Sequence, residues 1–255
     1  MSRISAMMDS GKRAMMSSQT SLQTVSHNIA NKSTEGFSRQ RVEQVTNTPV
    51  EVGGLRIGMG ARAATISRIN NPYLEKQIQK EGAHLGYLEG RSDSLNRVEQ
   101  VYNEQMNKGL NSYISDFFNA VRELSNNPES LATRTMVRES ADNMTKDFKR
   151  VANQLESVQM DLDTEVKAHV QVINQIAKEI AQLNEKVASV EIVGATANDE
   201  RDRRDLLIKK LAELIDIHVA DGENGMIAVT AGRSAVLVSG FTAMELSTAK
   251  LGEKG

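Results

Sequence analysis

The sequence predicts a mainly α-helical protein: a long, coiled-coil-like helical rod with a small β-hairpin region near the N-terminus and the start of a β domain at the C-terminus. Three observations favour this fold class. Apolar residues recur at alternating spacings of four and three along much of the chain, as in packed helices. Only 4% of the 255 residues are aromatic, and the last of three prolines is Pro128. Such a composition favours long helices over a compact mixed fold.

Residues 1–37 are predicted to be an N-terminal helix with a narrow apolar seam. Its a and d positions hold six apolar residues: Ile4, Met8, Met15, Leu22, Val25 and Ile29. The seam is interrupted by Gly11 and Ser18, and methionine suits irregular contacts. One interpretation is a helix that lies on its own domain. The narrow, interrupted seam favours the other interpretation, a surface for partner helices.

Residues 38–70 are predicted to form a β-hairpin or an extended loop, because Pro49 and several glycines break short alternations there. A helical rod is assigned to residues 71–216. Its first helix starts at Pro72, capped by Asn71, and is expected to reach Met106. Three glycines recur on one face of this helix and indicate close approach of a neighbouring helix: Gly82, Gly86 and Gly90.

A shorter helix ends at Pro128, and the longest predicted element runs from Ser130 to about Val190. A continuous helix of this length would measure on the order of 90 Å, which suits a rod. The heptad pattern slips over residues 162–166, a stutter that brings His169 or Val170 to the seam of this helix.

A further amphipathic helix is predicted from Asn198 to Ile215, followed by residues 217–255 as the beginning of an outer β domain. Three short strands are expected in this last part: Ile217–Val219, Met226–Val229 and Ala235–Val238. So few strands do not make an independent β domain.

Composition and motifs exclude several functional classes. The net charge is −2 with both signs interspersed, so no nucleic-acid partner is expected. No apolar run is long enough for a membrane span, and no cleaved signal peptide is recognised at the N-terminus. The four histidines are isolated, and the carboxylates of residues 199–205 alternate with arginines, which indicates a salt-bridge network at a helix start rather than a metal site. We therefore predict no catalytic residue, no metal and no cofactor, and no enzyme.

The most specific stretch of the sequence follows the seam. Its characteristic residues are Asn28, Ile29, Ala30, Asn31, Thr34, Gly36, Phe37, Arg39 and Gln40. The asparagines and Thr34 can end a helix through side-chain hydrogen bonds, and Gly36 can adopt a positive φ that lets Phe37 pack back. The asparagines also suggest a pairing role.

This stretch resembles the N-terminal signature of the axial proteins of the bacterial flagellum, which include rod, hook and hook-associated proteins. The extension from Gly36 to Gln40 is most similar to the hook-associated members. Two later segments, residues 116–128 and 203–207, extend that similarity over nearly the whole chain.

The resemblance implies a structural subunit at the hook–filament junction that filament assembly requires. Such a protein is exported by the flagellar type III apparatus without a cleaved signal and works outside the cell. Its implied partners are other copies of itself, neighbouring hook and hook-associated proteins, and an export chaperone. The signature and the seam would be subunit interfaces, with the N-terminal helix paired to a C-terminal helix in the inner tube.

Because this sequence shows no such C-terminal helix, we expect it to be a fragment of a longer protein. Two other functions are alternatives for this sequence. One is a coiled-coil signalling or adaptor rod, and the other is another flagellar axial protein of the hook or rod. A type III secreted translocator or needle-tip protein is a further alternative. None of the classes outside the flagellum accounts for the signature or for the terminal strands.

Overall fold

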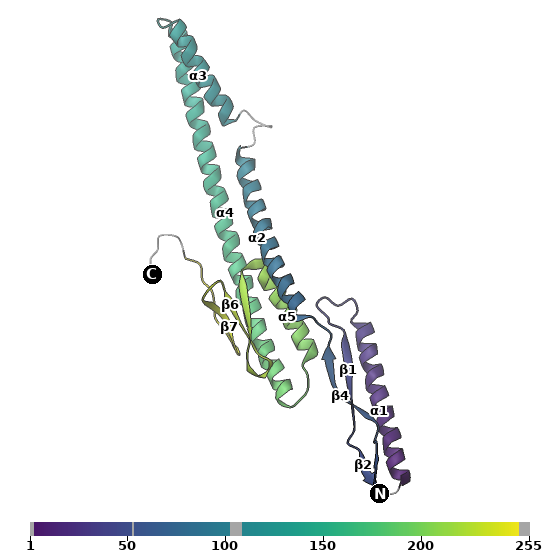
Figure 1. The fold of residues 1–255 in the computed structure, drawn as a ribbon. Helices are drawn as coiled ribbons and strands as arrows, with labels where there is room; N and C mark the ends of the chain where they lie inside the picture. The colour runs from purple at the N-terminus through teal and green to yellow at the C-terminus, as the bar shows by residue number, and fades with distance from the viewer. Residues whose placement is uncertain (1–2, 53, 103–108, 250–255) are drawn as a thin grey trace. The chain divides into compact units, whose positions relative to one another are not determined.

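A computed structural model describes residues 3–52, 54–102 and 109–249 of the chain (Figure 1). These residues belong to two compact units, Met1–Leu85 with Gln171–Ser247 and Gly86–Val170 with Thr248–Gly255. Within the described ranges, none of the helices has both the length and the apolar character that crossing a membrane requires. The predicted mainly α-helical class, with strands near both ends of the chain, is confirmed.

The first unit begins with helix α1, Arg3–Ala30, and a twisted β-hairpin (Figure 1). Strand β1, Gln40–Thr46, pairs antiparallel with β4, Ala61–Arg68, and the register shifts between Glu43 and Gln44. The strands β2 and β3, Val50–Val52 and Leu55–Ile57, form a second small hairpin between them. The β-hairpin interpretation of residues 38–70 is therefore confirmed, and α1 packs against both β1 and β4.

The rest of the first unit is a four-stranded antiparallel sheet packed on helices. The sheet has the order β5-β6-β7-β8, with strands Ile217–Asp221, Ile227–Ala231, Ala235–Ser239 and Thr242–Ala243. A short 3-10 turn, Glu223–Gly225, joins the first two strands. The three predicted strands exist, but the two-residue β8 was not predicted.

The hydrophobic core of this unit lies between the sheet, the C-terminal part of helix α4 and helix α5, Asn198–Leu214. Its fully buried apolar side chains include Ile180 on α4, Leu211 on α5 and Val229 in the sheet. One polar side chain, Asn184, is also fully buried there. Its Nδ2 donates to the carbonyls of Ile227 and Gly240 at 2.8 and 2.7 Å, so it joins α4 to strand β6 and to the turn between β7 and β8.

Helix α2 extends from Pro72 to Tyr102 and starts as predicted. The Asn71 Oδ1 accepts hydrogen bonds from the backbone N–H of Tyr73 and Leu74, at 3.1 and 3.4 Å. Its predicted end near Met106 lies outside the described residues. The close approach expected at its glycines is wrong for Gly90, since a Cβ there would meet nothing within 4 Å.

In the second unit, α3, Leu110–Asn126, is connected by a tight turn to the N-terminal part of helix α4, which spans Leu131–Ile192 and continues into the first unit. The Thr133 hydroxyl donates to the Asn127 carbonyl at 3.1 Å and holds this turn. Helix α4 is 62 residues long and continuous through the stutter, so the predicted long helix is confirmed. After the stutter Val170 is half-buried, whereas His169 is exposed.

Candidate functional site

The signature segment ends α1 through its own polar side chains. The Asn31 Nδ2 donates to the carbonyl of His27 at 3.1 Å, and the Thr34 hydroxyl donates to the Asn31 Oδ1 at 3.3 Å. Gly36 has a φ of 78°, a conformation that costs glycine little. The Phe37 ring then returns to contact the His27 ring edge to face, with centroids 5.4 Å apart. The predicted helix exit is therefore confirmed at each of these residues.

Asn28 pairs with a residue of the same chain. Its Nδ2 donates to the Gln40 carbonyl, and its Oδ1 accepts from the Gln40 backbone N–H, both at 2.9 Å. The side-chain amide thus binds the backbone of one residue as a neighbouring strand would. This pair fixes the start of β1 against the last turns of α1.

The signature segment also contacts the start of α5, more than 150 residues later in the chain. The buried Gln40 side chain donates to the Asp199 carboxylate at 2.7 Å, and the Ser38 backbone N–H donates to the Asp202 Oδ2 at 2.8 Å. The α carbon of Gly36 lies so close to Leu206 that an added Cβ would be 2.9 Å from the Leu206 Cβ. We name these contacts, together with those of β4 described next, the clasp.

Strand β4 contributes the charged centre of the clasp. Arg68 donates through Nη1 to Asp202 at 2.7 Å and to Asp205 at 2.8 Å, and the side chains of Arg68 and Asp202 are only 10% and 6% exposed. Burial opposes the charge of Arg68, but the two carboxylates outweigh it, so the pKa of Arg68 lies above its ordinary value. A buried arginine shared by two carboxylates resists separation, because parting them would leave a charge uncompensated.

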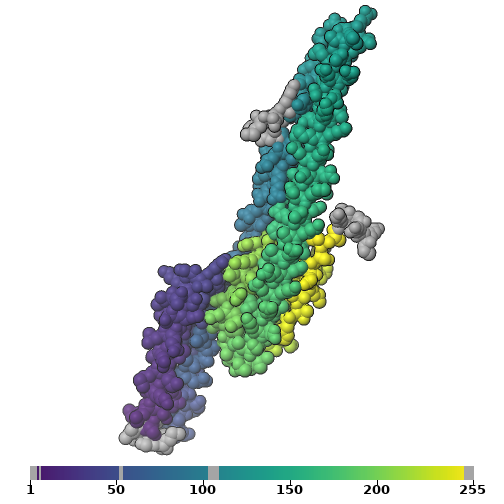
Figure 2. Space-filling view, turned by 180° about the vertical axis from the view of Figure 1, so that it is seen from behind, coloured from purple at the N-terminus to yellow at the C-terminus, as the bar shows by residue number. Residues whose placement is uncertain are grey.

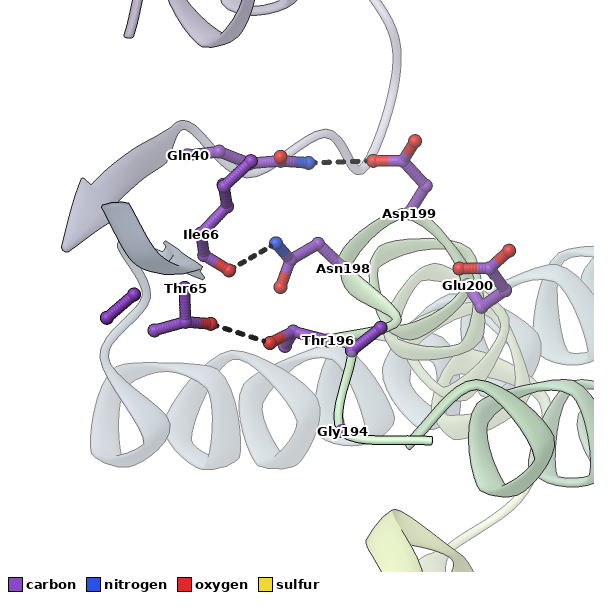
Figure 3. Close-up of a pocket in the computed structure, with 10 residues that line it drawn as sticks. Gln40, Thr65, Ile66, Gly194, Thr196, Asn198, Asp199 and Glu200 are labelled. Atoms are coloured by element: carbon purple, nitrogen blue, oxygen red, sulfur yellow. Dashed lines mark hydrogen bonds between the residues drawn. The ribbon is translucent and has the colours of Figure 1, made fainter. Parts of the chain in front are cut away.

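A hollow of about 360 Å³ lies between β4 and the start of α5 (Figure 3). Hydrogen bonds cross it from Asn198 to the Ile66 carbonyl at 2.7 Å and between the hydroxyls of Thr65 and Thr196 at 3.0 Å. The polar groups around it therefore bind each other and hold the two elements together. Among the described residues no group of three or more His, Cys, Asp or Glu side chains is placed to hold a metal ion.

The acidic start of α5 is a network of salt bridges, as predicted, but its partners lie outside the helix. Besides the pairs with Arg68, Arg201 of α5 binds Glu191 of α4 at 2.7 and 2.8 Å. The Glu191 pKa is lowered mainly by the hydrogen bond from Arg201. Sequence reasoning missed the contribution of Arg68, because only its position in the hairpin brings it to α5.

The outer face of α1 carries the predicted seam. Five of its residues are between 52% and 71% exposed, and Met7 and Met16 beside them are 75% and 57% exposed. We name these seven residues the stripe: Met7, Met8, Met15, Met16, Leu22, Val25 and Ile29. The side chain of Ile4 lies outside the described set. Figure 2 shows α1, in purple, at the surface of the protein.

The inner face of α1 is polar, which is the reverse of an ordinary surface helix. Ser17 and Thr24 are its buried residues, each 6% exposed. The Thr24 hydroxyl donates to the Thr20 carbonyl at 3.0 Å, and this satisfies it without a partner on another element. Of the remaining signature residues, Ala30 and Arg39 are exposed, and the Arg39 carbonyl accepts a β-sheet hydrogen bond from Ile69 at 2.8 Å.

Long helices and the exposed apolar stripe of α1 define the class of protein, a mainly α-helical one with small antiparallel sheets. Residues 95–254 match the family model "Flagellar hook-associated protein FlgK helical domain". Because this match covers more than half of the chain, the protein belongs to the FlgK family.

Relatives from several bacteria agree with this assignment. The chain is 30% identical over 239 residues to flagellar hook-associated protein 1 of Bacillus subtilis, covering 91% of this chain and 47% of that protein. It is 24% identical over 247 residues to the protein of the same name from Escherichia coli, covering 96% and 45%. The chain thus spans about half the length of the curated relatives that it matches.

A solved structure has a similar fold. The flagellar hook junction protein FlgK from Burkholderia pseudomallei matches with a TM-score of 0.56 and 23% identity, over 68% of this chain and 30% of that one.

Proposed function

We propose that this chain is a non-catalytic structural subunit of the bacterial flagellum, placed at the junction between hook and filament and required for filament assembly. It is exported through the flagellar type III apparatus without a cleaved signal and acts outside the cell, with an export chaperone as an earlier partner. The names of its relatives and the family match support this role. The observation that carries it is the exposed stripe of α1.

The stripe supports self-association in an axial assembly for an energetic reason. Burial of one large apolar side chain yields roughly 1.5 to 3 kcal/mol, and the polar inner face of α1 makes little use of this effect. The stripe contains the predicted seam, and the four–three spacing of the seam suits a partner helix in coiled-coil packing. Copies of this chain and neighbouring hook and hook-associated proteins are therefore its proposed partners.

The clasp holds the C-terminal end of α1 in a fixed position relative to the hairpin and α5, so that the stripe can pack against a partner helix. Asn28 and Gln40 join the helix to the hairpin, and Arg68 joins the hairpin to Asp202 of α5. In this proposal the signature residues act mainly by holding the stripe in position, and Ile29 is the large apolar side chain among them that is exposed to a partner.

The test introduces charge into the stripe. The double variant Leu22→Glu/Ile29→Glu is expressed in the source bacterium from which the gene has been deleted, with Leu22→Met/Ile29→Met as the matched apolar control. We expect the charged variant to reach the medium and leave hooks without filaments, as seen by electron microscopy, while the control restores filaments. Normal filaments with the charged variant would contradict the proposed role of the stripe.

The deletion alone separates the proposed function from a signalling rod. Hooks without filaments and flagellin lost to the medium are expected of a junction subunit. Normal filaments with abnormal motor switching would favour the signalling alternative and overturn our proposal.

A further inference from the structure

The N-terminal half of the stripe consists of methionines alone. Met7, Met8, Met15 and Met16 are 75%, 71%, 69% and 57% exposed. Met8 and Met15 are one heptad apart, and Met7 and Met16 flank them, so all four lie on the half of α1 that faces away from the buried Ser17 and Thr24. The C-terminal half of the stripe carries only hydrocarbon side chains: Leu22, Val25 and Ile29. A small oxidant in solution therefore has access to four thioethers on the face where association is proposed.

Exposed thioethers react with hydroperoxides in a two-electron step. A lone pair of the sulfur attacks one oxygen of hydrogen peroxide, an S–O bond forms and the O–O bond breaks. The other oxygen departs as hydroxide, takes up the proton of the transferred hydroxyl and leaves as water. The sulfur is oxidised and the peroxide is reduced. The product, methionine sulfoxide, is polar, and sulfoxide reductases return it to methionine.

We propose that these four methionines form an oxidation-sensitive modification site that switches off association through the stripe. The proposal rests on the function proposed above, because it requires that the stripe become buried between helices. Each sulfoxide oxygen would then have to enter an apolar contact without a hydrogen-bond donor, which is unfavourable. The hydrocarbon half of the stripe is unchanged by the oxidant, so the reduced form is fully recovered when the sulfoxides are repaired.

The other methionines provide internal controls. Met59 is only 6% exposed and should react slowly. Three methionines away from the stripe are exposed to a similar degree and should react without affecting association: Met136, Met160 and Met244 at 55%, 61% and 53%. Reaction at these sites separates a general effect of oxidation from a specific effect of the stripe.

The experiment compares three forms of the protein before and after brief treatment with hydrogen peroxide: the unchanged chain, a stripe variant (M7L, M8L, M15L, M16L) and an off-stripe variant (M136L, M160L, M244L). Each is added to hook-bearing cells of the source bacterium that lack the gene, and incorporation at hook ends is counted. Peptide mass spectrometry records sulfoxide at every methionine.

We expect peroxide to reduce incorporation of the unchanged chain and of the off-stripe variant about tenfold or more, with little effect on the stripe variant. Sulfoxide reductases should restore incorporation of the unchanged chain. That repair keeps the test decisive even when the stripe variant itself incorporates poorly. Full incorporation of chains that carry sulfoxide at all four positions would overturn the inference. Failure of the untreated chain to incorporate would instead contradict the proposed function and remove the basis of the inference.

Discussion

The side-chain amide of Asn28 binds both the backbone N–H and the backbone carbonyl of Gln40, each at 2.9 Å. A single residue of α1 thereby supplies what a paired strand would supply to the start of β1. The same backbone position also places the Gln40 side chain on Asp199 of α5, at 2.7 Å. Asn28 and Gln40 thus connect the end of the apolar stripe to the clasp, and this connection leads to the first prediction.

The substitution Asn28→Ala should loosen the start of β1. Loss of two partly buried hydrogen bonds should cost about 1 to 3 kcal/mol, because the backbone groups of Gln40 lose their protein partners. The measurement is amide hydrogen exchange of Gln40, which should become at least about tenfold faster. Asn31→Ala is the control, since Asn31 binds only groups near its own turn. Unchanged protection of the Gln40 amide would show that Asn28 does not hold the strand.

Gly36→Ala tests the tight contact with α5. Alanine at a φ of 78° costs about 1 to 2 kcal/mol, and its Cβ would also lie 2.9 Å from the Leu206 Cβ. The matched control is Gly54→Ala, because Gly54 has a φ of 82° but no atom within 4 Å of an added Cβ. Chemical denaturation should therefore show a larger loss of stability for Gly36→Ala than for Gly54→Ala. Equal losses would mean that the contact with Leu206 contributes nothing.

Asn184→Ala should be the most damaging of these substitutions. The Asn184 side chain is fully buried and binds the N–H and carbonyl of Ile227, the Gly240 carbonyl and the Arg204 guanidinium. Burial already lowers the pKa of Arg204 to about 10, so a lost hydrogen-bond partner is costly there. We expect a loss of about 3 to 5 kcal/mol in urea denaturation.

Asn174→Ala provides the comparison for this measurement. Asn174 binds the Leu246 backbone with the same two-bond geometry, at 2.8 and 2.9 Å, but is only partly buried. We expect a smaller loss of about 1 to 2 kcal/mol for it. A loss for Asn184→Ala no greater than that for Asn174→Ala would show that the buried network adds no stability.

The ion pair between Glu191 of α4 and Arg201 of α5 should weaken in acid. The Glu191 pKa is below 4.5 in the folded protein, mainly because Arg201 donates hydrogen bonds to it. Its stabilising contribution is therefore fully present above the unfolded value and is lost as the pH falls through the lowered folded value. Glu191→Gln should lower stability near neutral pH and flatten the acid limb of a plot of stability against pH.

Glu245→Gln is the control for this pH dependence. The Glu245 pKa is also lowered, by a hydrogen bond from Lys178, but Glu245 is 65% exposed and solvent screens the pair. The acid limb of this control should resemble that of the unchanged protein. Identical acid limbs for Glu191→Gln and the unchanged protein would show that the Glu191–Arg201 pair does not contribute to the loss of stability in acid.

Local patterns predicted the helices well. The heptad spacing placed the long helix within two residues of its observed ends, Leu131 and Ile192. The cap and proline at Asn71 and Pro72 marked the start of α2, because both signals act on the backbone of adjacent residues. The strand β8 was missed because two residues, Thr242 and Ala243, are too few to show an alternation.

The clasp could be predicted only in part. The polar exit of α1 follows from residues within one turn, so the roles of Asn31, Thr34 and Gly36 were predictable. The pairing of Arg68 with Asp202 joins positions 134 residues apart. The sequence around either residue contains no pattern that predicts the other as its partner. The sequence predicts a salt-bridge network within the start of α5. In the structure the carboxylates there bind Ser38, Gln40 and Arg68, which lie far away in the sequence.

Three asparagines that each bind both backbone groups of a single residue have a consequence for a protein proposed to assemble with many copies of itself. Asn28, Asn174 and Asn184 each occupy the N–H and carbonyl of one extended residue: Gln40, Leu246 and Ile227. Open strand edges are templates for unwanted pairing with another chain. Of the three residues, Gln40 begins the edge strand β1, whereas Ile227 lies in the inner strand β6 and Leu246 follows β8. Crowded chains therefore find no free backbone group at Gln40 through which β1 could pair with a neighbouring strand.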